Sequence, residues 1–294
     1  MNRTLKTLLL LIYLLGVTTV CLYVLFPSDT AKAFIESAVS RSNPDVQLPI
    51  KQVRLSFPPG IQIDSGALVF QDQKIINIEN IRFLPHILTL LNAWKTIGVT
   101  ANAGGGKLKG KLEAESSNSI PQIRANGKIS GGRLEDLPVL EILVSNKISG
   151  ACEGTFEYNG INGAPKTLSA QLSITDCSVE INPPVDGLTT LSFKQVNAKV
   201  RLDKQGLKIE ECILRGAQMD GQFAGSIGFR RPFEKSIVNI TGGMRLHLKF
   251  LATLKQGTFG GVVLDGDAGA GELPFKCEGT LKDPLFQLIE SVSR

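Results

Sequence analysis

The chain has 294 residues, of which 43% are apolar and 20% are charged, a composition typical of a folded protein with a sizeable core. Its formal net charge is +5, and subtracting Arg3 and Lys6 near the N-terminus leaves about +3 for the rest. Because no basic stripe interleaved with aromatic residues accompanies this weak charge, we do not expect nucleic acid as a partner.

The chain opens with an apolar run, TLLLLIYLLGVTTVCLYVLF at 7–26, which holds no charged side chain. A helix that rises about 1.5 Å per residue over this run would cross the roughly 30 Å of bilayer hydrocarbon, so the run predicts a transmembrane anchor. Arg3 and Lys6 on its short flank predict a cytoplasmic N-terminus and export of everything after Pro27. The alternative is a cleaved signal peptide, because Ala31-Lys32-Ala33 fits a cleavage site, although such segments usually hold only about 7–15 apolar residues.

The sequence therefore predicts two parts: a cytoplasmic tip and anchor at 1–28, and an exported body at 29–294, in the periplasm if the source is a bacterium. The body begins with SDTAKAFIESAVSR at 28–41, whose apolar spacing and Ser/Asp start predict an amphipathic helix. Two further helices are expected at 84–95 and 135–147, capping the ends of a sheet. The first of these would place on one face Ile87, Leu88, Leu91 and Trp94.

Elsewhere apolar and polar residues alternate, which is typical of β-strands with one face in water. Strands of this kind are expected at 53–57, 122–129, 168–174, 196–202, 221–229, 246–250 and 275–281. Lysines 107, 109 and 111 alternate in the same way and are expected on the solvent-exposed face of a strand. A parallel sheet is not expected, because strands and helices do not alternate along the chain.

The tetrapeptide Cys-Glu-Gly-Thr occurs twice, at 152–155 and 277–280. In an extended strand the cysteine, the glycine and the following large apolar residue share one face. Residues 221–229 show the same alternation, with glycine and large apolar residues on one face, but without a cysteine. The large apolar residues of these three strands are the candidate lining of an apolar groove: Phe156, Phe223, Ile227, Phe229, Phe275 and Leu281.

Glycine recurs on the same face as these large residues. Inside a strand, glycine marks a bend, a bulge or the close approach of another group, and glycines with bulges allow a sheet to curl. The predicted fold class is therefore mainly β, with a strongly curved antiparallel sheet that forms a trough-like groove and carries few short helices. A closed β-sandwich filled by its own side chains fits the periodicity equally well.

Four cysteines are expected in the exported body, where an oxidising compartment permits disulfides in three connectivities. Spacing does not choose among these connectivities. We expect Cys177 and Cys212 to lie on nearby strands, which makes them the first pair to test. The other cysteines are Cys152 and Cys277 in the body and Cys21 in the anchor.

Motifs for catalysis, cofactors and metal ions are missing from the sequence. AGGGKLKG at 103–110 lacks the Ser or Thr that follows Lys in a phosphate-binding loop, and neither His86 nor His247 lies near a cysteine as in a zinc site. His247 alternates out of phase with its apolar neighbours, which predicts an exposed strand residue. The adjacent carboxylates Glu210 and Glu211 are expected on opposite faces of a strand. We therefore expect no cofactor, no metal ion and no enzymatic activity.

These features together resemble a known family. The anchor, the segments FPSDTAKAFIESAVSR and VRLSFPPGIQIDSGALVF, the glycine-punctuated strands and the closing CEGTLKDPLFQL are similar to the type II secretion system protein N family, which belongs with the AsmA-like periplasmic proteins. The resemblance spans nearly the whole chain. It implies an inner-membrane-anchored periplasmic protein that serves the export of folded proteins across the outer membrane. It also implies a curved sheet with an apolar groove that can carry lipids between membranes.

Three functions are thus open. The first is a non-enzymatic component of a type II secretion system, whose open sheet edges dock other secretion-system proteins. The second is a lipid-binding or lipid-transfer module, whose groove shields phospholipid acyl chains at about 0.8 kcal/mol per buried methylene. The third, an exported hydrolase, lacks a nucleophile motif in the sequence.

Overall fold

The computed structural model describes residues 3–57, 60–89, 92, 94–115, 122–143, 146–161, 164–185, 188–203, 205–251, 258–259, 262–263 and 272–289. Within these residues, one antiparallel sheet of 15 strands makes up most of the molecule. A separate small hairpin consists of β14 (Thr258–Phe259) and β15 (Val262–Val263). The prediction of a mainly β, antiparallel fold with few short helices is confirmed.

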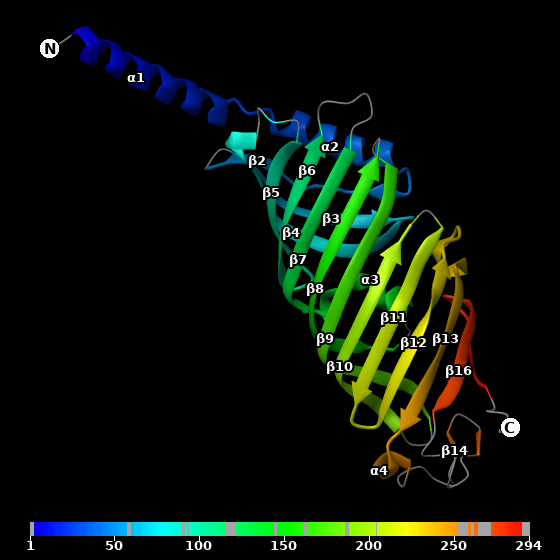
Figure 1. Ribbon diagram of the computed structural model, residues 1–294. Helices are drawn as coiled ribbons and strands as arrows, with labels where there is room; N and C mark the ends of the chain where they lie inside the picture. Colours follow the sequence, from blue (N-terminus) through cyan, green and yellow to red (C-terminus); the bar gives the residue numbers. More distant parts are fainter. Residues whose placement is uncertain are drawn as a thin grey trace.

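Strands of the large sheet follow one another in chain order from β3 to β17, while β1 and β2 both pair with β3. Figure 1 shows this succession along the molecule. The bounds are β1 Val46–Gln47, β2 Val53–Ser56, β3 Gly60–Phe70, β4 Gln73–Pro85, β5 Trp94–Ala103, β6 Gly106–Glu115, β7 Gln122–Arg133, β8 Ile148–Ile161, β9 Ala164–Val185, β10 Leu188–Leu202, β11 Gly206–Gly216, β12 Met219–Gly228, β13 Ile237–Leu246, β16 Leu273–Thr280 and β17 Pro284–Leu288.

The N-terminal helix α1 (Arg3–Val24) covers most of the predicted anchor and projects away from the sheet (Figure 1). In the part of the chain that is described, no helix combines the length and the apolar character needed to cross a membrane. The transmembrane part of the prediction is therefore not supported.

Helix α2 (Ser28–Ser42) confirms the amphipathic helix expected at 28–41, although its N-cap residue is Pro27 and no side chain caps it. The helix expected at 84–95 is wrong. Among the described residues of this range, the 3-10 turn η1 (Ile87–Thr89) is the only helical element, Leu88 is 92% exposed, and Trp94 starts strand β5. Trp94 pairs with Glu115 of β6, and from Ile97 onward β5 pairs with both β4 and β6. This strand pairing overrides a short helical spacing. Leu91 lies outside the described residues.

The third expected helix is confirmed in part, as the 3-10 turn η2 (Leu134–Asp136) and helix α3 (Pro138–Leu143). The strand expected at 246–250 is wrong, because β13 ends at Leu246 and a short helix, α4 (Leu248–Leu251), follows. The chain turns there as the Phe250 N–H donates to the His247 carbonyl at 2.9 Å.

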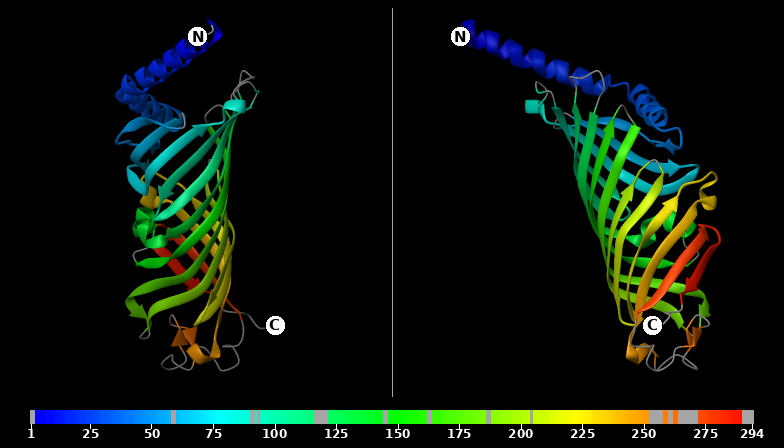
Figure 2. Two further views of the ribbon diagram at one scale, coloured as in Figure 1. Left: turned by 90° about the vertical axis from the view of Figure 1, so that its left-hand side faces the viewer. Right: turned by 45° about the vertical axis from the view of Figure 1, so that its right-hand side comes forward.

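The sheet bends sharply along a line that crosses β7 to β10. The registers shift between Ile129 and Gly132 in β7, around Gly150 in β8, and between Phe193 and Gln195 in β10. Gly150 in β8 has a positive φ of 150°, and Asp176 in β9 has a positive φ of 50°. Bulges bend a strand and increase its twist, so neighbouring bulges turn all four strands together. In Figure 2 the strands curve round to face one another, and one curled sheet replaces the two packed sheets of the alternative sandwich.

Three apolar clusters hold this shape. The first, around Cys152, Phe193 and Met244, lies on the face that also receives Leu134 of η2. The second, around Val53 and Ile63, lies under α2. The third surrounds Phe233 in the 3-10 turn η3 (Phe233–Lys235), between β12 and β13.

Candidate functional site

One face of the large sheet, here called the inner face, carries Cys152, Phe156 and Phe223. Side chains alternate along a strand, so every second residue belongs to this face, and the strand register joins these residues into rows across the sheet. One such row, the Phe156 row, runs from β5 to β17 and contains Val99, Gly110, Gly127, Phe156, Ala170, Val200, Ile209, Gly225, Ile240, Cys277 and Phe286. Every member is apolar or glycine.

The rows on either side of the Phe156 row are equally apolar. The row through Tyr158 consists of Ile97, Leu112, Ala125, Tyr158, Leu168, Leu202, Leu207, Ile227, Val238, Gly279 and Pro284. The row on the other side consists of Ala101, Leu108, Ile129, Gly154, Leu172, Ala198, Cys212, Phe223, Gly242, Phe275 and Leu288. The inner face therefore presents three uninterrupted apolar rows without a single charge.

Burial changes along the strands of this face. At the end near the bulge line, Cys152, Val196 and Met244 are buried beneath η2, α4 and their neighbours. In the Phe156 row no member is buried, and Phe286 is 52% exposed. The protein's own side chains thus fill the end of the inner face near the bulge line and leave the Phe156 row partly exposed.

Glycines on the inner face make room for the large side chains beside them. A Cβ at position 127 would lie 2.7 Å from the Phe156 ring, and one at position 242 would lie 2.6 Å from the Cβ of Phe223. Because Gly242 has no side chain, Phe223 of β12 and Phe275 of β16 meet across β13, with ring centroids 6.4 Å apart. The predicted glycine pattern therefore serves close packing as well as bending.

The structure separates the six predicted lining residues into groups. Phe223 and Phe275 belong to one row, and Phe156 lies in the next row on β8. The other three, Ile227, Phe229 and Leu281, gather around Phe233, where Leu281 is 8% exposed. Phe229 follows the end of β12, and its ring lies 5.7 Å from that of Phe233.

All five cysteines are free thiols in this structure. Cys177 and Cys212 belong to the same buried cluster, together with Cys152. Burial raises the pKa of Cys212 to about 11, and the nearby Cys177 adds to this rise. Burial also raises the pKa of Cys177, so both thiols are neutral at physiological pH. A disulfide between them stays a prediction.

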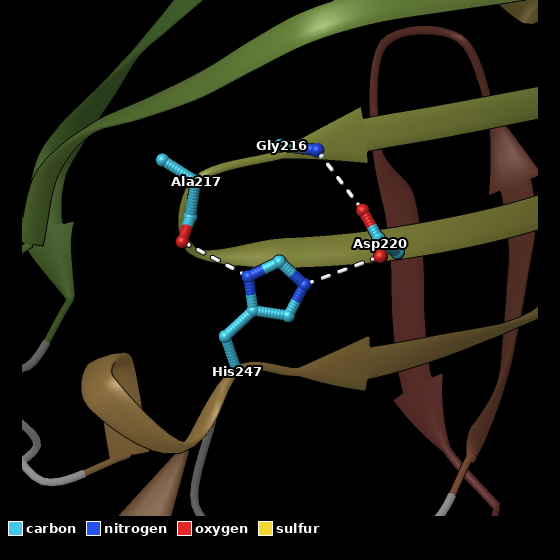
Figure 3. Close-up of polar contacts among 4 residues, drawn as sticks. All are labelled: Gly216, Ala217, Asp220 and His247. Carbon is cyan, nitrogen blue, oxygen red and sulfur yellow. Dashed lines mark hydrogen bonds and ion pairs between the residues drawn. The ribbon is translucent and has the colours of Figure 1, made fainter.

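His247 joins the turn after β11 to the end of β13, as Figure 3 shows. Its Nδ1 lies 3.0 Å from the Ala217 carbonyl oxygen and its Nε2 lies 3.2 Å from Oδ2 of Asp220. The other carboxylate oxygen of Asp220 accepts a hydrogen bond from the Gly216 N–H at 3.1 Å. Two acceptors favour the doubly protonated ring, so the pKa of His247 is raised, chiefly by the bond to Asp220 and then by that to Ala217.

The prediction that His247 is a strand residue is wrong, because β13 ends before it; its side chain is 35% exposed and its ring is paired with Asp220. Sequence spacing gave no signal for this pair, since the two residues meet only through the pairing of β12 with β13. Within the described residues, the ring has no hydrogen bond to a serine, threonine or cysteine. The pair ties the turn after β11 to the end of β13.

The outer face is charged. Lys107, Lys109 and Lys111 are exposed along β6, as predicted. Glu210 and Glu211 are not on opposite faces, because they pair with Arg201 at 2.9 Å and Lys199 at 3.3 Å, which both lie on the outer face of β10. A register shift between Ile209 and Cys212 turns both carboxylates outward.

Comparisons of the chain with protein families, with curated proteins and with solved structures found no match. In the described ranges, no group of three or more His, Cys, Asp or Glu side chains is placed to hold a metal ion.

Proposed function

We propose that this chain binds lipid acyl chains along its inner face, as a non-enzymatic protein attached to the bacterial inner membrane with its body in the periplasm. The observation that supports this proposal is the Phe156 row, which is apolar from β5 to β17 and has no buried member. Large exposed apolar surfaces on soluble domains mark binding sites for ligands, proteins or membranes. Among these ligands, acyl chains need no polar partner on the protein.

The dimensions of the row suit an elongated apolar ligand. At the usual strand spacing of about 4.8 Å, the eleven members of the Phe156 row span roughly 48 Å, whereas one bilayer leaflet holds roughly 15 Å of hydrocarbon. An acyl chain lying on the row removes apolar surface from water at about 0.8 kcal/mol per methylene. Several acyl chains would therefore fit in succession.

Membrane attachment is part of the proposal. In α1, the side chains of Leu10, Leu14 and Val24 are 67%, 61% and 76% exposed, so the sheet does not bury them. We expect the full chain to float with liposomes of bacterial phospholipids and a chain without residues 1–27 to stay in solution. Equal flotation of both chains would show that α1 is not what attaches the chain to the membrane.

Lipid binding is tested with a phospholipid that carries a fluorescent acyl chain. Ala170→Asp places a charge in the middle of the Phe156 row, whereas the neighbouring Gln171→Asp places it on the outer face. We expect the first variant to bind at least tenfold more weakly than the wild type and the second to bind normally, with circular dichroism confirming both folds. No binding by the wild type, or equal binding by all three chains, rejects the proposal.

A second candidate function is an accessory component of a type II secretion system, which the resemblance of the sequence suggests. Its structural support is strand β17, whose exposed apolar residues Leu285 and Phe286 offer an edge to a partner. Deleting the gene should then reduce the export of folded proteins across the outer membrane and leave their passage across the inner membrane unchanged. Unaltered export would reject this candidate.

A further inference from the structure

The two edges of the large sheet differ in their protection. At the N-terminal edge, α2 packs on β1 and β2, and Glu36 of α2 accepts a hydrogen bond from the Ile50 N–H at 2.8 Å. At the C-terminal edge, β17 pairs with β16 and with no other strand in the described part of the chain. Within the described residues, one edge is therefore covered by a helix and the other has no second partner strand.

Strand β17 also carries few of the features that keep an edge from pairing: it is short and begins with a proline, but it has no charged side chain. Natural edges carry charged side chains, prolines or bulges, yet the only proline here is Pro284 at the first position. Leu285, Phe286 and Ile289 are 63%, 52% and 47% exposed. Such an edge is a template for another strand.

The backbone of β17 shows which groups face outward. The Ile289 N–H donates to the Pro274 carbonyl at 2.8 Å, so it points toward the β16 side. Because orientation alternates along a strand, the N–H and C=O groups of Phe286 and Leu288 point the other way, toward an incoming strand. Phe286 lies at the centre of the strand.

We infer that β17 pairs with β17 of a second copy of this chain, antiparallel and around a two-fold axis at Phe286. In this register, Phe286 lies opposite Phe286 of the copy, Pro284 opposite Leu288, and Leu285 opposite Gln287. Apolar residues then meet apolar residues on the inner face, and no charged residue of β17 faces its like. A two-fold interface requires such self-complementarity.

The pairing places both inner faces on the same side of one continuous sheet. The Phe156 row ends at Phe286, which stacks on Phe275 with ring centroids 5.3 Å apart, so the row would continue directly into the copy. Pairing of β17 with the N-terminal edge of another copy is disfavoured, because α2 packs on β1 and β2 at that edge. The inference does not rest on lipid binding, and its test uses no lipid.

The test is the oligomeric state of the full chain in detergent, measured by sedimentation velocity. We expect the wild type to be a dimer, and Phe286→Lys and Phe286→Glu each to be monomers, because like charges would face each other across the axis. An equimolar mixture of the two variants should recover the dimer, since opposite charges then meet. A monomeric wild type, dimers of either variant alone, or a mixture that stays monomeric overturns the inference.

A photo-crosslinking measurement on an otherwise unaltered chain provides a second test if the charged variants fail to fold. p-Benzoylphenylalanine at Leu285 should give a crosslink between two copies. The same group at Phe57, which is 85% exposed at the other edge, should give none. Absence of the two-copy crosslink at Leu285, including the case in which another protein is captured instead, overturns the inference.

Discussion

The ring of Phe70 at the end of β3 lies 5.5 Å from the ring of Phe229, just after β12, although β4 to β11 separate these two strands in the sheet. Phe233 contacts Phe70 edge-on at 5.8 Å. Asp45 and Arg231 form an ion pair between the same two regions. The curled sheet is thus held together at one corner by residues that its strand order places far apart.

The aromatic contact between Phe70 and Phe229 should be measurable as a coupling energy. A double-mutant cycle with Phe70→Ala and Phe229→Ala is expected to give about 0.5–1.5 kcal/mol in the free energy of unfolding, as found for aromatic pairs. Urea denaturation provides the measurement. Phe57→Ala, at an 85% exposed position, is the control and should change stability by less than about 0.5 kcal/mol. Strict additivity of the two core substitutions would show that the corner does not form.

Gly242→Ala should destabilise the protein far more than Gly228→Ala. At position 242 a Cβ would lie 2.3 Å from the Gln222 carbonyl oxygen, whereas at position 228 the nearest atom is 4.0 Å away. Overpacking of this kind costs about 1–3 kcal/mol, while alanine at an open position is neutral or adds about 0.4–1 kcal/mol by restricting the unfolded chain. Equal unfolding free energies for the two variants would contradict the close packing of Phe223 against Phe275.

His247 should titrate above its ordinary pKa of 6.5, because Asp220 and the Ala217 carbonyl both accept from its protonated ring. Since the folded-state pKa is raised, the stabilising contribution is fully present below pH 6.5 and is lost as the pH rises through the raised value. The titration midpoint can be followed by NMR of the imidazole carbon-bound protons. Asp220→Asn keeps an oxygen for the Gly216 N–H and should lower the midpoint, so an unchanged midpoint in this variant would refute the pairing.

Cys212 should react slowly in the reduced, folded protein. With a pKa of about 11, only about one thiol in a thousand is ionised at pH 8, and the thiolate is the species that reacts with iodoacetamide. Peptide mapping after alkylation should therefore find Cys212 unmodified in buffer and modified in urea. Rapid modification in buffer would contradict its burial. In oxidised protein, non-reducing maps that show Cys177 and Cys212 as separate thiols would end the prediction of their disulfide.

The alternation of side chains could be predicted wherever a strand is regular. Around Phe156 and Phe223 the apolar and polar phases assigned from the sequence match the partly buried and the exposed sides. The phase fails at a bulge, because one extra residue turns the following side chain to the other face, as at Glu210 and Glu211. A single-sequence pattern contains no information on where such a residue is inserted.

Contacts that depend on register or curvature could not be predicted. His247 and Asp220 become neighbours only when β12 and β13 pair, and Phe229 meets Phe70 only because the whole sheet curls. The spacing that suggested a helix through Trp94 was too short to outweigh strand pairing on both sides of β5. The continuous Phe156 row also emerges only when each register is known.

The most direct test of the central claim is photo-crosslinking from two adjacent residues that face opposite ways. Phe156 lies in the inner-face row, and Thr155 lies beside it on the exposed outer face. p-Benzoylphenylalanine is placed at one position or the other in the full chain, in bacterial cells grown with radiolabelled phosphate. We expect a labelled phospholipid adduct from position 156 and none from position 155. No adduct at either position, or equal adducts at both, would contradict acyl-chain binding on the inner face.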